Sequence, residues 1–311
     1  MRVLFLGGLG RSGTTLLERV LSQLPGVVAL GEVVHLWERS LVHDEPCGCG
    51  QPFSQCEFWR EVGDVAFGGW AAVDVDRVLS LRGSVDRTRF IPQLARRHSS
   101  GVPADLAEYL SYYRRLYQAA AQVSGAEVML DSSKHASLAF CLKHAADVDL
   151  HVVHCVRDSR AVAYSWTKQV ARPEAAVGEK LMKRYPPATS AMIWNSHNAA
   201  FSLLRRLGTP TSLLRYEDFV AAPRSTARSV ARFAGSPVSD ADLAFLGDRQ
   251  VDLAVGHTAS GNPLRFRTGV VPIRVDNAWR ESFPPLQQRL VTALTLPLLV
   301  RYGYVRPKGS K

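Results

Sequence analysis

The sequence predicts an α/β fold in which a central, mainly parallel β-sheet is flanked by helices. Short apolar runs typical of buried strands alternate with longer stretches whose apolar residues have helical spacing. A glycine-rich loop separates the first apolar run from the first helical pattern. No Pro/Gly/Ser-rich linker, charge block or internal repeat divides the 311 residues, so we expect one domain over residues 1–311.

The first elements are a strand, a helix and a second strand. Residues 2–6 form a short, mostly apolar run that two glycines end, which predicts a buried strand. Residues 14–24 carry apolar side chains at helical spacing up to a Pro-Gly pair, which ends the expected helix. Residues 27–30 form the second strand, and a glycine closes it.

Three further apolar runs predict strands at residues 128–130, 150–156 and 211–215. A helical pattern follows each of them, and the last of these helices begins near Pro223. Because strands alternate with helices, we expect a sheet covered on both faces, with ligands bound at the carboxyl ends of its strands. The other expected helices are residues 74–97, 104–123 and 188–207.

The composition gives a net charge of +10, which suits an anionic ligand, a nucleic acid or an anionic membrane surface. The basic residues are scattered, and no zinc-finger or RNA-binding signature is present, so we expect no nucleic-acid partner. The N-terminal apolar stretch is too short for a signal peptide, and the apolar segment at residues 294–300 contains Pro297. We therefore expect a cytoplasmic protein without stable membrane insertion.

The glycine-rich loop at residues 7–15 reads GGLGRSGTT. Gly8 and Gly13 have the spacing of the two glycines in a P-loop, whose amides hold phosphate at a helix N-terminus. The lysine of that motif is replaced by Thr14, and Arg11 supplies the positive charge from within the loop. A kinase or nucleotidase would need the lysine and an acidic metal partner, for which Asp131 is the one candidate. A glycine-rich turn without a ligand is the other alternative.

A second motif, residues 152–166, reads VVHCVRDSRAVAYSW. The expected strand runs into Arg157, and Ser165 follows eight residues later on the next helix. An arginine offers phosphate a bidentate fork, and a serine adds a hydroxyl donor. The alternative is that Arg157 pairs with a surface carboxylate and Ser165 has no role.

These two motifs resemble those of sulfotransferases that use 3′-phosphoadenosine 5′-phosphosulfate (PAPS). Residues 10–21 resemble the 5′-phosphosulfate loop and residues 156–166 the 3′-phosphate motif. The resemblance implies transfer of a sulfuryl group from PAPS, without a metal, to a hydroxyl of a small molecule, glycan or lipid. An arginine at the position of Arg11 is a feature that this sequence shares with bacterial members and with the tyrosylprotein branch of the family. This arginine would stabilise charge without acting as an acid. The implied donor-binding residues are Gly10, Arg11, Ser12, Gly13, Thr14, Thr15, Arg157 and Ser165.

Two later segments extend the resemblance. Residues 215–219 resemble the family's Arg-Tyr-Glu-Asp segment, which places Tyr216 near the adenine. Residues 261–283 resemble the loop that closes over the nucleotide, so that Arg265 or Arg267 would reach the 3′-phosphate and Trp279 would anchor the loop. In the animal cytosolic branch the arginine of this loop lies closer to its tryptophan. Core packing is the alternative for Tyr216 and Trp279.

The acceptor hydroxyl needs a base. Glu32 follows the second strand, where the tyrosylprotein and heparan branches carry a catalytic glutamate, and His35 is the alternative base. Lys134 resembles a lysine that faces donor or acceptor in the family and would neutralise sulfuryl charge. Each of these residues has an alternative without catalysis. Glu32 could complement the dipole of a helix that starts there, and His35 could simply pack or lie on the surface. Residues 131–134 could cap the end of the strand before the next helix.

The sequence contains five cysteines, of which Cys141 and Cys155 lie in apolar patterns and are expected in the core. The remaining three, Cys47, Cys49 and Cys56, could bind zinc with His43. Their spacing fits no standard zinc finger or ribbon, so the favoured interpretation is a compact loop over the site, and a metal is not part of the predicted site. The sequence does not decide whether the three thiols are free, disulfide-bonded or metal-binding.

The acceptor and the oligomeric state do not follow from the sequence. The segments expected to line or cover the acceptor pocket are residues 74–97, 104–123 and 168–187. Their tyrosines have helical spacing, which favours packing over acceptor binding. These tyrosines are Tyr109, Tyr112, Tyr113, Tyr117 and Tyr185. A nucleotide-binding protein of the same fold without activity is the remaining alternative.

Overall fold

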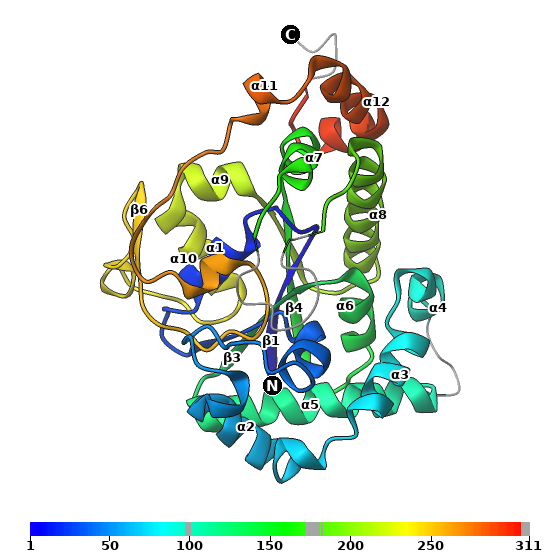
Figure 1. Cartoon of the computed structure of the whole chain (residues 1–311), viewed down its shortest axis with the longest axis vertical. Helices are drawn as coiled ribbons and strands as arrows, with labels where there is room; N and C mark the ends of the chain where they lie inside the picture. The colour runs from blue at the N-terminus through cyan, green and yellow to red at the C-terminus, as the bar shows by residue number, and fades with distance from the viewer. Residues whose placement is uncertain (97–100, 172–180, 182, 306–311) are drawn as a thin grey trace.

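The computed structural model describes residues 1–96, 101–171, 181 and 183–305. Five parallel strands form the central sheet in the order β2-β3-β1-β4-β5 (Figure 1). This arrangement confirms the predicted α/β fold with a parallel sheet. The strands are β1 (Arg2–Gly7), β2 (Val27–Gly31), β3 (Val128–Lys134), β4 (Asp149–Val156) and β5 (Thr211–Arg215).

Helices cover both faces of the sheet, and the side chains of β1 show why its run is almost entirely apolar. Val3 and Phe5 are buried against α5 (Ala104–Ser124) and α6 (Ala136–Leu142). Leu4 and Leu6 point to the opposite face, where they pack with α1 (Thr14–Leu21) and α10 (Pro223–Phe233). A strand buried on both faces needs apolar residues at every position.

The remaining elements surround these layers. Helix α8 (Pro187–Arg206) packs against α7 (Ser159–Thr167) and α12 (Pro285–Arg301), as the upper part of Figure 1 shows. A two-stranded antiparallel ribbon of β6 (Gln250–Leu253) and β7 (Gly269–Pro272) lies near α10. None of the helices in the described residues is long and apolar enough to cross a membrane. These elements are α2 (Glu57–Phe67), α3 (Val75–Val85), α4 (Ile91–Leu94), α7 (Ser159–Thr167), α8 (Pro187–Arg206), α9 (Tyr216–Ala221), β6 (Gln250–Leu253), β7 (Gly269–Pro272), α11 (Trp279–Ser282) and α12 (Pro285–Arg301).

The expected helix at residues 74–97 is wrong as one element, because the chain divides it into α3 and α4. Asp86 leaves the helical conformation, with φ −107° and ψ 71°. Its buried carboxylate accepts a hydrogen bond from the Tyr109 hydroxyl at 2.8 Å, which favours the break. Strand β3 also extends beyond residues 128–130, because the polar residues that follow it stay in the sheet and are buried.

Candidate functional site

A cavity of about 790 Å³ opens where the strands of the main sheet end. Its walls come from the loop after β1, from residues following β2, from the end of β3 and from the residues after β4. This is the edge at which parallel sheets bind ligands. The predicted residues that line it are Gly10, Arg11, Gly13, Thr14, Thr15, Glu32, His35, Lys134, Arg157, Ser165 and Tyr216.

The glycine-rich loop adopts a backbone that only certain residues accept readily. Arg11 and Gly13 have positive φ angles of 76° and 78°. A Cβ at Gly13 would lie 2.3 Å from the ring of Tyr216, so a glycine is required there. The loop then enters α1 at Thr14. Turns of this kind gather successive amide groups at a helix N-terminus, which is a favourable place for an anion.

Arg11 extends from this loop over the indole of Trp166, with its guanidinium carbon 5.1 Å from the ring centroid. Burial lowers the pKa of Arg11 from its usual value, and the nearby charge of Glu32 raises it in part. Arginine stays protonated under ordinary conditions, so Arg11 supplies a cation and hydrogen-bond donors but cannot act as a general acid.

Arg157 lies beside the glycine-rich loop although it follows a different strand. Its Nη1 donates to the carbonyl oxygen of Arg11 at 3.0 Å, and its Nη2 donates to Oδ2 of Asp276 at 3.1 Å. The guanidinium also stacks on Tyr216, 4.6 Å from the ring centroid. Two sequence motifs 146 residues apart thus form one basic end of the cavity.

Glu32 is held by backbone and side-chain bonds at another part of the cavity. Its amide donates to the carbonyl oxygen of Ala259 at 2.8 Å, and Lys134 Nζ donates to its Oε1 at 2.5 Å. Burial raises the pKa of Glu32, but the charge and hydrogen bond of Lys134, together with the charges of Arg39 and His135, outweigh burial, so the pKa lies below its usual value. His35 lies on the same face, with Nε2 3.8 Å from Glu32 Oε2. Burial lowers the pKa of His35, which favours a neutral imidazole.

A model described as "Sulfotransferase family" matches residues 4–240 of the chain. The chain belongs to the sulfotransferase family. No curated protein matches it. Among solved structures, the sulfotransferase domain of an olefin synthase from Synechococcus PCC 7002 is 20% identical, with a TM-score of 0.50 over 99% of this chain and 96% of that one. A sulfotransferase domain from the curacin biosynthetic pathway is 15% identical, with a TM-score of 0.51 over 98% of both chains. These structures share the fold.

Behind the cavity of this sulfotransferase, a buried network fixes the end of β3. The carboxylate of Asp131 accepts hydrogen bonds from the Tyr117 hydroxyl at 2.6 Å and from the Ser133 amide at 2.7 Å. Ser133 Oγ accepts from the amide of Val34 at 3.0 Å. Asp131 is fully buried, and burial raises its pKa to about 6. Asp131 is not among the residues that line the cavity, so it positions the backbone before Lys134 and is not placed to hold a phosphate-bound metal.

Three of the predicted donor-binding residues do not line the cavity. Ser12 is 4% exposed. Arg265 is buried, stacks on Phe266 and donates to the carbonyl oxygen of Thr258 at 3.3 Å. Arg267 is exposed, and its carbonyl oxygen accepts a hydrogen bond from Arg19 at 3.0 Å. The arginines of the late loop therefore lie apart from the cavity wall that Arg157 forms.

The late loop reaches the cavity through residues that sequence reasoning did not select. Asp276 lines the cavity and pairs with Arg157, as described above. Trp279 is 4% exposed, and Arg160 stacks on its ring at 4.7 Å, so this tryptophan anchors the loop by packing. The other lining residues absent from the prediction include Arg39, His135, Trp166, Lys183 and His197. Trp166 closes the motif at residues 152–166, although no role was predicted for it, and the other four lie outside both motifs.

The segments expected to line the acceptor pocket contribute fewer residues to the cavity wall than predicted. Tyr109, Tyr113 and Tyr117 are fully buried in the core, which confirms packing, whereas Tyr185 lines the cavity beside Trp166. Of the expected segment at residues 168–187, positions 172–180 and 182 lie outside the described residues. Cys141 and Cys155 are buried in the core, as predicted. Cys47, Cys49 and Cys56 are not among the lining residues, so the expected loop over the site is not part of its wall.

Proposed function

We propose that the chain, as one domain over residues 1–311, transfers the sulfuryl group of PAPS to a hydroxyl of a small-molecule, glycan or lipid acceptor. The observation that carries this proposal is the contact between Arg157 and the backbone of Arg11. It joins the loop suited to a 5′-phosphosulfate to the arginine suited to a 3′-phosphate, in the cavity that also holds Glu32. A ligand with phosphate groups at both ends of one nucleoside fits this pairing.

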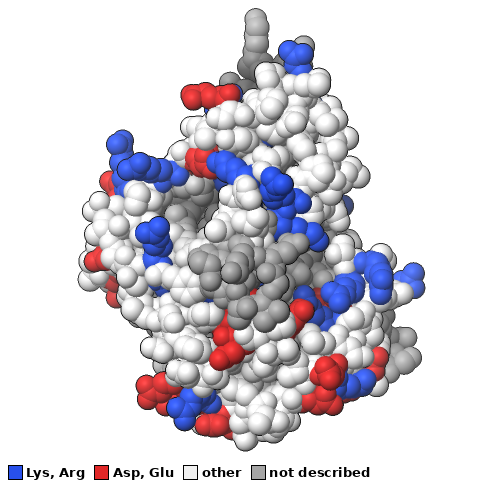
Figure 2. Space-filling model, in the orientation of Figure 1, with Lys and Arg blue, Asp and Glu red and all other residues white. Residues whose placement is uncertain are grey.

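The charge of the cavity supports a polyanionic donor. The described lining residues include five cationic side chains, those of Arg11, Arg39, Lys134, Arg157 and Lys183, against the carboxylates of Glu32 and Asp276. Figure 2 shows Lys and Arg side chains gathered mainly over the upper and right-hand parts of this face, while many of the Asp and Glu side chains lie toward its lower edge. Such a field attracts anions to the cavity.

In the proposed reaction the acceptor oxygen attacks sulfur while the bond from sulfur to the 5′-phosphate oxygen breaks. Adenosine 3′,5′-bisphosphate leaves, and Glu32 takes the proton of the acceptor hydroxyl. The loop amides and Arg11 would stabilise the charge that develops on the leaving phosphate, and Lys134 the charge on the sulfuryl oxygens. Positioning and electrostatics of this kind suffice for transfer from an activated anhydride, by analogy with phosphoryl transfer.

The ion pair between Glu32 and Lys134 implies that the donor binds before Glu32 becomes an effective base. A carboxylate that holds a lysine at 2.5 Å is a weak base, because the lysine stabilises its ionised form. A sulfuryl group beside Lys134 would compete for the ammonium. Once Lys134 turns to that group, the burial of Glu32 would be opposed only by the weaker effects of Arg39 and His135, and its pKa would rise. The base would thus strengthen when the donor is in place.

Calorimetric titration with adenosine 3′,5′-bisphosphate and separately with ATP, each with Mg²⁺ and with EDTA, tests the donor site. We expect metal-independent binding of the bisphosphate that Arg157→Ala weakens by roughly 10- to 100-fold, since a hydrogen bond to a charged group contributes about 1.5–3 kcal/mol. The matched control is Arg206→Ala, an exposed arginine that does not line the cavity. Tight ATP binding that needs Mg²⁺, without a response to the bisphosphate, would refute the proposed donor.

A further inference from the structure

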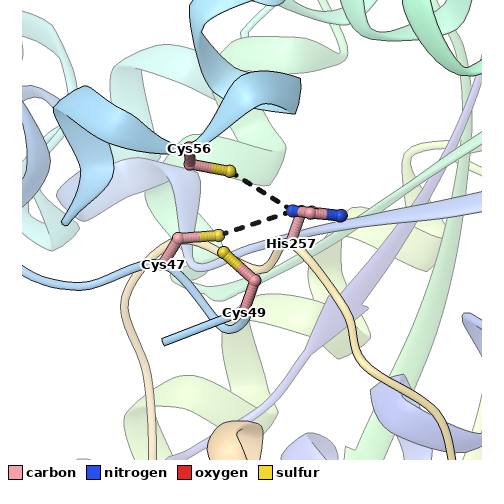
Figure 3. A group of neighbouring side chains, drawn as sticks. All are labelled: Cys47, Cys49, Cys56 and His257. Atoms are coloured by element: carbon pink, nitrogen blue, oxygen red, sulfur yellow. Dashed lines mark hydrogen bonds between the residues drawn. The ribbon is translucent and has the colours of Figure 1, made fainter. Parts of the chain in front are cut away.

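Three cysteines and one histidine meet outside the cavity (Figure 3). Cys47, Cys49 and Cys56 lie between β2 and α2, and His257 follows β6, about 200 positions later in the chain. The three sulfur atoms and a ring nitrogen of His257 all lie within 4.8 Å of one another. Cys47 and Cys56 are 0% and 1% exposed, and Cys49 and His257 are partly buried.

The arrangement of the three sulfur atoms and the His257 nitrogen resembles that of a four-ligand metal site without its ion. Cys56 Sγ lies 3.2 Å and Cys47 Sγ 3.9 Å from Nδ1 of His257. A tetrahedral zinc ion with bonds of about 2.3 Å to sulfur and about 2.0–2.1 Å to nitrogen holds a sulfur and a nitrogen ligand roughly 3.6 Å apart. The four side chains point toward one another in Figure 3, so their ligand atoms surround one small space. All five cysteines of the chain lie in the described residues and are free of disulfides.

We propose that Cys47, Cys49, Cys56 and His257 bind a structural zinc ion. Three thiolates and one imidazole form a ligand set that favours zinc over hard cations, and four protein ligands leave no open position for a substrate. His43, the histidine nearest in sequence, is not part of the cluster. The fourth ligand comes instead from a segment that only the fold brings into reach.

The surroundings hold both ligand segments in position. The indole Nε1 of Trp59 donates to the carbonyl oxygen of His257 at 2.7 Å, and the ring of Phe58 packs 5.4 Å from the imidazole. The Gly48 amide donates to the carbonyl oxygen of Thr258 at 3.0 Å. A Cβ at Gly48 would lie 2.8 Å from the carbonyl oxygen of Gly256, so the two backbones pack too closely for any larger residue. Partners around a ligand orient it for the metal.

A short stretch of backbone connects the cluster to Glu32, the candidate catalytic base. Two residues after His257, Ala259 donates to the carbonyl oxygen of Leu30 at 2.9 Å and accepts from the Glu32 amide at 2.8 Å. Gly261 then passes beside the Glu32 carboxylate and lines the cavity. A zinc ion would therefore fasten residues 256–261, which position Glu32, to the loop at residues 47–56. This inference concerns stability and does not depend on the proposed donor.

Metal analysis of the full-length protein, purified without chelators, tests the proposal. We expect a single zinc ion per chain, lost in Cys56→Ser and in His257→Ala. Cys141→Ser, a buried cysteine elsewhere in the core, and His43→Ala are the matched controls and should retain zinc. Replacement by Co²⁺ should give the intense visible bands of a tetrahedral thiolate site. Wild-type protein without zinc, before and after incubation with Zn²⁺ under reducing conditions, or a Cys47–Cys56 disulfide in its place, would overturn the proposal.

A second measurement does not depend on whether the variants fold. Removing zinc from the wild-type protein with a strong chelator should make three further thiols reactive and lower the midpoint of thermal unfolding by about 5 °C or more. Hydrogen exchange should become faster in residues 256–261 but not in the distant part of α5. Unchanged thiol reactivity and exchange after metal removal would show that these residues do not hold the ion.

Discussion

Lys134 Nζ lies 2.5 Å from Glu32 Oε1, although the two residues stand at the ends of different strands. Lys134 reaches this position because its backbone has a positive φ of 67° after a buried polar segment. Both side chains line the cavity. The pair places a carboxylate able to accept a proton next to a cation able to hold an anionic group. Substituting each of the two residues in turn tests this relationship.

Glu32→Gln should spare binding of adenosine 3′,5′-bisphosphate and lower the rate of sulfuryl transfer by at least about 100-fold, since general base catalysis commonly contributes 10²–10⁴-fold. The assay is transfer of label from PAPS in the presence of an acceptor found by screening. Glu38→Gln, an exposed glutamate outside the cavity lining, is the control and should keep its rate. If Glu32→Gln keeps a nearly full rate, Glu32 is not the base and His35→Asn is the next variant.

Lys134→Met should move the acidic limb of the pH–rate profile to higher pH by roughly one unit or more. The sign follows from the causes: burial raises the pKa of Glu32 and Lys134 gives the largest opposing effect, so loss of the lysine raises the pKa although Arg39 and His135 still lower it. Glu32 would then be protonated, and inactive as a base, over a wider acidic range. The profile of kcat/KM measures this shift. An unmoved limb with a lower rate would mean that Lys134 acts on the donor but does not set the pKa of Glu32.

Asp276→Asn should tighten binding of adenosine 3′,5′-bisphosphate by a few fold, because Asp276 occupies the Arg157 guanidinium at 3.1 Å and adds a negative charge to an anion site. Calorimetry on the variant gives the dissociation constant. Asp248→Asn changes an exposed carboxylate outside the cavity and should leave binding unchanged. Weaker binding in Asp276→Asn would indicate that the carboxylate orients Arg157 for the ligand and does not compete with it.

The sequence predicted the strands well where burial on both faces demands apolar residues, as in β1 and β4. It predicted too short a β3, because residues 131–134 are polar and yet buried through hydrogen bonds such as Tyr117 to Asp131. The ribbon β6-β7 was missed, since four-residue strands with partly exposed faces give a weak pattern. These failures occur where hydrogen bonding, and not apolar burial, decides the structure.

The cavity was predicted where a motif and its spacing were local. The loop at residues 7–15 and the Arg157–Ser165 pair each lie within one continuous strand–loop–helix segment, so their types and spacing are visible in the sequence. Asp276 and His257 carry no such signal, because each meets its partner more than 100 residues away. For the same reason the sequence favours His43, the histidine nearest to the cysteines in the chain, although the fold brings His257 to them.

Glu18 supplies a test of the fold that does not involve the reaction. This glutamate of α1 is 3% exposed, and burial raises its pKa to about 7, against smaller opposing effects from Lys134 and Ser132. A carboxyl group with a raised pKa in the folded state stabilises the fold at low pH, where it is neutral in both states. That stability is lost as the pH rises from about 4.5, the ordinary value, through about 7.

Glu18→Gln should therefore remove this loss. The free energy of unfolding of the variant should exceed that of the wild type at pH 8 by up to about 3 kcal/mol, the linkage value for a pKa raised from about 4.5 to about 7. The difference should shrink as the pH approaches 5. Urea unfolding at both pH values measures it. Glu61→Gln, an exposed glutamate, should show no such dependence on pH. A Glu18→Gln variant that is less stable than the wild type at pH 8 would mean that the ionised carboxylate has favourable partners that outweigh its burial.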